Sequence, residues 1–168
     1  MKFALALFAF AGLASSAHAA VGLEGRYVEK KYVVDYDLSD NEAECKRYKG
    51  VYEEGLCMSP VKDVAKIKEA ADGFDVSIQT WGNDMDGCLF EGKGRLTSEN
   101  VIAASEVTDR YVDGEWKDNA GLCSVTVTVK NNILTVTDPS EDCENLCGMH
   151  ATVEIEKAKK IRPRTRRP

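Results

Sequence analysis

The stretch "CSVTVTVKNNILTVT", residues 123–137, carries the clearest structural signal in this chain. Apolar and polar side chains alternate in its first half, which places Cys123, Val125, Val127 and Val129 on one face. A period of two is typical of an antiparallel strand with one buried face. The stretch therefore predicts a protein built mainly from β-strands.

The Asn131-Asn132 pair in the middle of this stretch predicts a two-residue hairpin turn, because Asn tolerates the positive φ that such turns need. If Lys130 pairs with Ile133, valines of the first strand face Leu134 and Val136 of the second. The apolar face is then continuous across the hairpin, as a single register requires.

Similar patterns extend outward along the chain. Strands are indicated at residues 24–36, 74–81, 100–107 and 150–158, and "VDGEW" predicts a second hairpin turn at Asp113-Gly114. Residues 39–50 predict a short helix with Ser39 and Glu42 as its capping box, whereas residues 59–73 fit either a helix or a strand. We therefore expect a small antiparallel β-sheet or barrel with one short helix.

The first nineteen residues, "MKFALALFAFAGLASSAHA", have the pattern of a secretory signal peptide. A single Lys precedes an apolar run, and Ala17-His18-Ala19 supplies the small residues that signal peptidase recognises. The run is too short for a membrane-spanning helix, and no later stretch is long and apolar enough for one. We expect a periplasmic or secreted product that begins at Ala20.

The charge is distributed unevenly along the chain. Of the 22 basic residues, seven lie in "KAKKIRPRTRRP" (157–168) and one in the signal peptide, which leaves 14 against 28 acidic residues and a net charge of −14 for residues 20–156. A body of this charge disfavours nucleic acid and favours basic partners. The sequence thus predicts one β domain at 20–156 and a basic disordered tail at 157–168.

An even number of cysteines behind a signal peptide predicts three disulfides formed in an oxidising compartment, with fifteen connectivities open. We expect sequential pairing, in which residues 143–147 must fold back as a turn. Zinc is the alternative at Cys143, Cys147 and His150, but a fourth ligand at a suitable spacing is missing. The expected pairs are Cys45–Cys57, Cys88–Cys123 and Cys143–Cys147.

The stretch "WGNDMDGC", residues 81–88, raises the question of a calcium loop. With Gly87 at the sixth position of an EF-hand loop, Gly82 occupies the first position and Lys93 the twelfth, so two ligands are lost. Gly and Asn are common turn residues, and strands are expected on both sides. The pattern favours a hairpin loop over a metal site.

The chemistry-bearing residues do not form a recognisable catalytic motif. His150, the one histidine after residue 19, lies beside the apolar "ATVEI" and is expected to end a strand. The chain has no nucleophile elbow, phosphate-binding glycine loop or His-rich metal signature, and oxidised cysteines are not nucleophiles. With 28 acidic residues, neighbouring carboxylates arise by chance. We expect no enzymatic activity and no cofactor.

Three segments, "WGNDMDGCLFEGKG" (81–94), "GLCSVTVTV" (121–129) and "CENLCGMHATVE" (143–154), resemble a group of exported proteobacterial proteins, some of which are labelled lysozyme-inhibitor-like. The resemblance spans residues 60–157 and rests on cysteine and glycine placement. It implies the pairs Cys88–Cys123 and Cys143–Cys147 and favours a strand at 61–69. This chain departs from the group at "DMDG", where a histidine is common.

These observations predict an exported binding protein, with an inhibitor of a lysozyme or another hydrolase as the leading hypothesis. A disulfide-linked scaffold keeps binding loops rigid, and an acidic body attracts a basic protein such as a lysozyme. The alternative is an envelope-associated protein whose basic tail contacts an anionic cell-envelope polymer. The candidate binding residues flank the two hairpin loops: Trp81, Asp84, Tyr111, Asp113 and Trp116.

Overall fold

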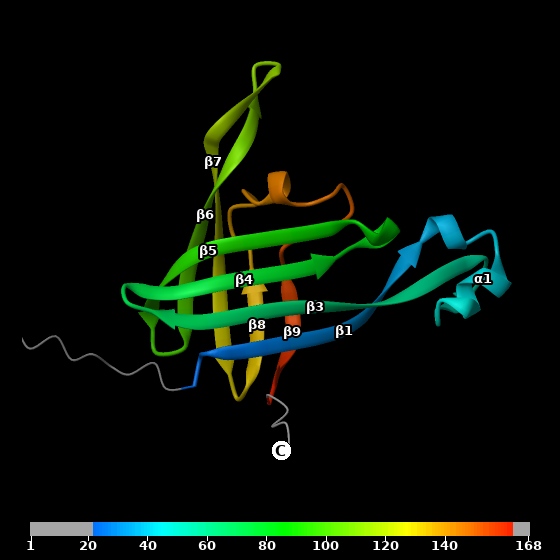
Figure 1. The fold of residues 1–168 in the computed structure, drawn as a ribbon, viewed down its shortest axis with the longest axis horizontal. Helices are drawn as coiled ribbons and strands as arrows, with labels where there is room; N and C mark the ends of the chain where they lie inside the picture. The colour runs from blue at the N-terminus through cyan, green and yellow to red at the C-terminus, as the bar shows by residue number, and fades with distance from the viewer. Residues whose placement is uncertain (1–21, 163–168) are drawn as a thin grey trace, which may run out of the picture.

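The computed structural model describes residues 22–162, with the side chains of residues 110–112 and 116 left out of the description. The signal peptide expected at 1–19 therefore lies outside the described residues. One nine-stranded antiparallel sheet organises the described chain (Figure 1). Its strands are β1 (Gly25–Asp35), β2 (Val51–Glu53), β3 (Leu56–Ala70), β4 (Gly73–Trp81), β5 (Gly87–Ser98), β6 (Val101–Val112), β7 (Glu115–Lys130), β8 (Ile133–Thr137) and β9 (Ile155–Ile161).

The sheet closes into an eight-stranded barrel because β1 pairs with β9 on one side and with β3 on the other. The β1–β3 pairing runs from Gly25 opposite Ile67 to Asp35 opposite Cys57. The short strand β2 pairs only with the beginning of β3 and lies outside the ring. The prediction of a mainly β protein with a barrel, one short helix and three disulfides is confirmed.

The alternation seen in the sequence corresponds to the inside and outside of the barrel. Phe74, Val76, Ile78 and Thr80 of β4 are buried in the interior, and so are the alternate valines of β7. The ambiguous residues 59–73 form most of β3, the turn at 71–72 and the first residue of β4. The odd-numbered side chains from Cys57 to Ile67 are all buried. The alternation of buried and exposed side chains, which is typical of a strand rather than of a helix, thus identifies this segment as a strand.

Both predicted hairpin turns are present. Lys130 pairs with Ile133 around Asn131-Asn132, whose φ values are 53° and 62°. The second turn joins β6 to β7, with Asp113 at φ 55° and Gly114 at φ 88°. These left-handed conformations are the ones that Asn, Asp and Gly adopt most readily.

The predicted helix forms as α1 (Glu42–Arg47), but its cap differs from the expectation. Asn41 is the N-cap residue, and its Oδ1 accepts a hydrogen bond from the amide of Glu44 at 3.1 Å. The Ser39 hydroxyl instead donates to the Asp35 carbonyl at 2.7 Å and accepts from the Cys57 amide at 3.0 Å. The capping box that we expected from Ser39 and Glu42 was therefore wrong, because Ser39 ties the start of this connection to β3. Within the described residues, no helix has the length and apolar character needed to cross a bilayer.

The two ends of the barrel differ in their connections (Figure 1). One end, which we call the short-turn end, has the two-residue turns at 71–72, 99–100 and 131–132. The opposite end, the long-loop end, has the 36–55 connection with α1, the 82–86 loop, the projecting β6–β7 hairpin and the 138–154 connection. Elaborated loops at one end of a regular scaffold are the usual place for function.

All three disulfides lie at the long-loop end, where they fix its connections. Cys45–Cys57 forms as expected, but the other two expected pairs are wrong: the structure has Cys88–Cys147 and Cys123–Cys143. Cys88 and Cys123 lie on β5 and β7, which are separated by β6. The segment between Cys143 and Cys147 does fold as a turn, a 3-10 helix at Glu144–Leu146, yet each cysteine bonds to a barrel strand rather than to the other.

Strand β9 changes the expected boundary of the basic tail. Residues 157–161 belong to this strand, with Ala158 fully buried opposite Leu134 of β8 and Ile161 opposite Arg26 of β1. The predicted start of the tail at residue 157 was therefore wrong, because residues 157–161 belong to β9, which joins β8 to β1 and closes the barrel. Residues 163–168 of the expected tail lie outside the described residues.

Candidate functional site

The 81–88 stretch connects β4 to β5 as a hairpin loop. Trp81 pairs with Gly87, the amide of Gly82 donates to the carbonyl of Asp86 at 2.8 Å, and Asn83–Met85 form a single 3-10 turn, η2. The hairpin that the turn residues predicted is confirmed.

The polar side chains of this loop accept hydrogen bonds from backbone amides of other segments. Asn83 Oδ1 accepts from the amide of Val34 at 3.0 Å, and Asp84 Oδ1 accepts from the amide of Tyr36 at 3.1 Å. Asp84 is one of the residues on which the calcium hypothesis depended, and here it accepts from a backbone amide just after β1, next to the Asn83 bond to β1. The described residues contain no group of three or more His, Cys, Asp or Glu side chains arranged to hold a metal ion.

The loop also contacts the 138–154 connection at close range. Asp86 Oδ2 accepts from the amide of His150 at 3.0 Å and lies 3.1 Å from its Nδ1 atom. Gly82 approaches His150 so closely that a Cβ atom there would lie 1.7 Å from the His150 carbonyl oxygen. His150 is thus part of a contact between two loops and lies outside any strand.

Between this loop and the 36–55 connection lies a groove of about 440 Å³, which we call the acidic groove. Four of the nine residues that line it within the described chain are acidic, and none is basic. They come from β1 and the turn after it, from α1, from β3 and from η2. The lining residues are Asp35, Asp37, Leu38, Glu44, Tyr48, Ser59, Pro60, Asp84 and Met85.

The floor of the acidic groove is rigid. The Asp35 carboxylate is buried, accepting from the amide of Leu38 at 3.3 Å and from the hydroxyl of Ser59 at 3.1 Å. The Cys45–Cys57 disulfide fastens α1 to β3, and it packs so tightly on Gly50 that a Cβ atom there would lie 2.7 Å from Cys45 Sγ. Little of this surface needs to become ordered when a ligand binds.

Aromatic side chains lie in and beside the groove. Tyr48 lines the groove and is 57% exposed. Tyr32 on β1 and Tyr36 directly after this strand are each more than half exposed. Met85 of η2 adds a large apolar side chain with 41% of its surface exposed. Tyrosine and methionine are enriched at protein–protein interfaces, so these exposed side chains make the groove a candidate binding surface.

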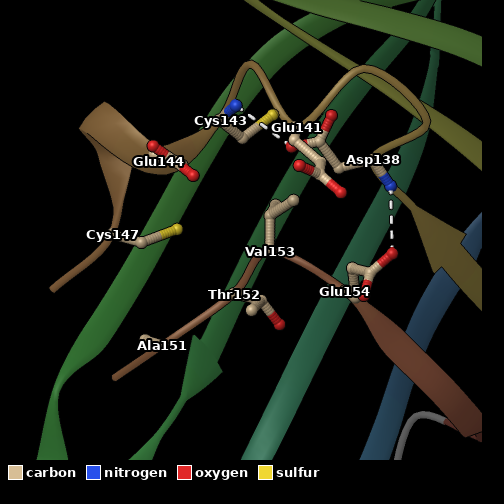
Figure 2. A pocket seen from close by; sticks show the side chains of 9 residues that line it. All are labelled: Asp138, Glu141, Cys143, Glu144, Cys147, Ala151, Thr152, Val153 and Glu154. Carbon is tan, nitrogen blue, oxygen red and sulfur yellow. Dashed lines mark hydrogen bonds between the residues drawn. The ribbon is translucent and has the colours of Figure 1, made fainter. Parts of the chain in front are cut away.

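A second pocket, of about 250 Å³, lies within the 138–154 connection (Figure 2). Two of its four acidic side chains organise the loop itself. Asp138 Oδ2 accepts from the amide of Cys143 at 3.0 Å, and Glu154 Oε1 accepts from the amide of Asp138 at 3.3 Å. Because this pocket has no aromatic side chain in its lining, we take the acidic groove as the candidate binding surface instead.

An ion pair between a buried carboxylate and a partly exposed lysine lies near the long-loop end of the barrel. Lys31 Nζ is 2.6 Å from Asp63 Oδ2, and the Asp63 side chain is only 1% exposed. Asp63 Oδ1 also accepts from the amide of Trp81 at 2.9 Å. Burial raises the pKa of the Asp63 carboxyl above its ordinary value, although the Lys31 ammonium and the Trp81 amide oppose this effect.

The structure places the five predicted binding residues on two separate loops. Trp81 and Asp84 lie at the β4–β5 loop, and Asp84 lines the acidic groove. Tyr111, Asp113 and Trp116 lie at the tip of the β6–β7 hairpin, which projects from the barrel by itself (Figure 1). Tyr111 pairs with Trp116 in the ladder, but these two side chains are outside the described part of the chain.

Sequence reasoning missed most of the groove. Asp35 ends β1, and Asp37, Glu44 and Tyr48 come from the connection after it, which the sequence indicated only as a strand followed by a helix. One signal was available: Tyr32 falls on the outward face of its strand, where an aromatic side chain is exposed.

Comparisons with known proteins add no neighbour to this description: no protein-family model matches the chain, and no curated protein or solved structure does so either.

Proposed function

We propose that this protein is an exported, non-catalytic binding protein that holds a basic protein partner, and that the partner is a lysozyme or another hydrolase whose activity it inhibits. The observation that carries the proposal is the acidic groove: a fixed concave surface with four carboxylates and an exposed tyrosine in its lining. The net charge of −14 over residues 20–156 would speed the encounter with a basic partner.

The arrangement of the disulfides supports export and binding together. Three disulfides are consistent with an oxidising compartment, either the periplasm or the exterior. Because all three fix connections of the long-loop end, they hold the candidate binding surface in one conformation. A surface fixed before binding loses less conformational entropy on association.

The test uses the oxidised protein starting at Ala20, titrated against a panel of lysozymes of different classes while cell-wall lysis is followed. We expect stoichiometric inhibition of at least one class, weaker at high salt because screening reduces charge attraction. Reduced and alkylated protein is the control and is expected to lose inhibition. If no class is inhibited by the oxidised protein, the lysozyme version of the proposal fails.

The second candidate is an envelope-associated protein anchored through the basic segment near the C-terminus. Strand β9 ends at the short-turn end of the barrel, whereas the acidic groove lies at the long-loop end (Figure 1). Attachment to an anionic envelope polymer there would leave the groove accessible. Sedimentation with envelope polymer, compared between the full chain and one that ends at Arg162, tests this function directly.

A further inference from the structure

We propose that the acidic groove is the docking site for an arginine-bearing loop of the partner protein. This inference rests on the proposed function, since it assumes that a basic protein is bound, but it assigns the contact to one surface and to one type of side chain. Lysine is the weaker alternative because its ammonium group is a compact point charge without the planar donor geometry of a guanidinium group.

The charges in the groove call for a cation. Asp35 is buried there with only neutral donors, the Leu38 amide and the Ser59 hydroxyl, on its carboxylate. Among the described residues, the one ion-pair contact to the four groove acids is from His150 Nδ1, 3.8 Å from Asp84 Oδ2. A cationic side chain that enters the groove would meet carboxylates on several sides that, among the described side chains, have no lysine or arginine partner.

The tyrosine in the groove favours arginine over lysine. A guanidinium group is planar, so it can form paired hydrogen bonds with a carboxylate while its face stacks on an aromatic ring, whereas an ammonium group is a compact point charge without a flat face. Tyr48, the C-cap residue of α1, offers such a ring within the groove, and Glu44 lies one turn before it. The volume of about 440 Å³ falls in the range of roughly 300–1,000 Å³ typical of ligand pockets.

The last strand of the barrel ends far from this site. Ile161 pairs with Arg26, and Asp35 lies nine residues farther along β1, roughly 30 Å away at about 3.3 Å per residue. The proposal assigns the arginine to a basic partner protein, because the net charge of −14 over residues 20–156 attracts that class of protein.

The test begins with a probe that does not depend on any lysozyme. Blocked Gly-Arg-Gly-Arg-Gly peptide is titrated into the oxidised, ¹⁵N-labelled protein, with the Lys and the uncharged citrulline versions as comparisons. We expect amide shifts confined to residues 35–48, 57–60 and 83–86, larger for the Arg peptide than for the Lys peptide and absent for citrulline. Shifts elsewhere, or equal shifts for all three peptides, would overturn the assignment.

Two double variants separate the site from the overall charge. Asp37→Asn/Glu44→Gln removes two groove charges, and Asp72→Asn/Glu99→Gln removes two exposed charges at the short-turn end, so the net charge of the two variants is the same. The first is expected to weaken Arg-peptide binding about fivefold, as two exposed charge pairs of roughly 0.5 kcal/mol would. The second is expected to change it less than twofold. Equal weakening by both variants, or by neither, contradicts the proposal.

The same variants distinguish failure of this inference from failure of the proposed function. If a lysozyme is inhibited equally well by the native protein and by Asp37→Asn/Glu44→Gln, the inhibitor function stands and the groove is not its docking site. If the peptide binds in the groove but no lysozyme is inhibited, the docking site stands and the identity of the partner is wrong.

Discussion

The carboxylate of Asp86 holds His150 from two directions, accepting from its amide at 3.0 Å and lying 3.1 Å from its Nδ1 atom. These residues are 64 positions apart and belong to two different loops of the long-loop end. The amide of Gly148 adds a bond to the carbonyl of Gly87 at 3.0 Å, next to the Cys88–Cys147 disulfide. The 82–86 loop and the 138–154 connection therefore behave as one unit.

Gly82→Ala should break this unit. The new Cβ atom would lie 1.7 Å from the His150 carbonyl oxygen, and neither backbone can move without losing the Asp86–His150 hydrogen bond. Overpacking together with a lost bond to a charged acceptor should lower the free energy of unfolding by about 3 kcal/mol. Urea denaturation of the oxidised protein measures this change in the free energy of unfolding.

Gly87→Ala is the matched control for that substitution, because Gly87 directly follows the same loop as the first residue of β5 and its Cβ atom would approach no atom closer than 3.6 Å, on the ring of Trp81. It should change the free energy of unfolding by no more than about 0.5 kcal/mol. Equal effects of the two substitutions would mean that the close approach of Gly82 to His150 does not exist in solution.

The disulfide pairing should be visible by peptide mapping of the oxidised protein. Trypsin leaves Cys143 and Cys147 on one peptide, so cleavage after Glu144 with a glutamate-specific protease is also required. We expect two separate linked pairs of peptides, one with Cys88 and Cys147 and the other with Cys123 and Cys143. A linked peptide that joins Cys88 to Cys123 would restore the sequential pairing and contradict the structure.

What the sequence could predict was local. Strict alternation in 123–129 and the Asn131-Asn132 turn depend on neighbouring residues only, and both are present in the structure as expected. Ser39 and Asn41 are two residues apart and both can cap a helix, so the choice between them depends on the contact of Ser39 with β3. That contact is not encoded in the local pattern.

The disulfides and the groove could not be predicted because they depend on distant segments. Cys88 meets Cys147 in an antiparallel bridge only after the 138–154 connection has folded back to β5. The groove similarly combines Asp35, Tyr48 and Asp84, which come from three different connections or strand ends. The periodicity within one segment carries no information about which distant segment that segment will contact.

Asp63→Asn should change how stability depends on pH. Because burial raises the pKa of Asp63 in the folded protein above its ordinary value of 3.8, ionising this group costs stability. The cost is absent below the ordinary pKa and complete above the raised one, so it grows as pH rises through that window. The variant has no such group. The free energy of unfolding of Asp63→Asn, minus that of the native protein, should therefore rise with pH across this range in urea denaturation.

Asp75→Asn provides a control of opposite sign. The ion pair with Lys93 holds the pKa of Asp75 below its ordinary value, so its stabilising contribution is present above the ordinary pKa and lost as pH falls through the lowered one. For this variant the same difference should fall as pH rises. A difference that is independent of pH for Asp63→Asn would show that its carboxyl is not buried as described.

Truncation near the C-terminus should separate strand β9 from the basic segment that follows it. Deletion of 157–168 removes buried Ala158 and the residues that pair with both β1 and β8, so the barrel opens and cooperative thermal unfolding should be lost. Deletion of 163–168 leaves β9 complete and should shift Tm by less than about 2 °C, which corresponds to roughly 0.5 kcal/mol for a domain of this size. Circular dichroism during heating measures both variants. If the longer deletion unfolds as cooperatively as the shorter one, β9 does not close the barrel, and the boundary expected at residue 157 would be correct.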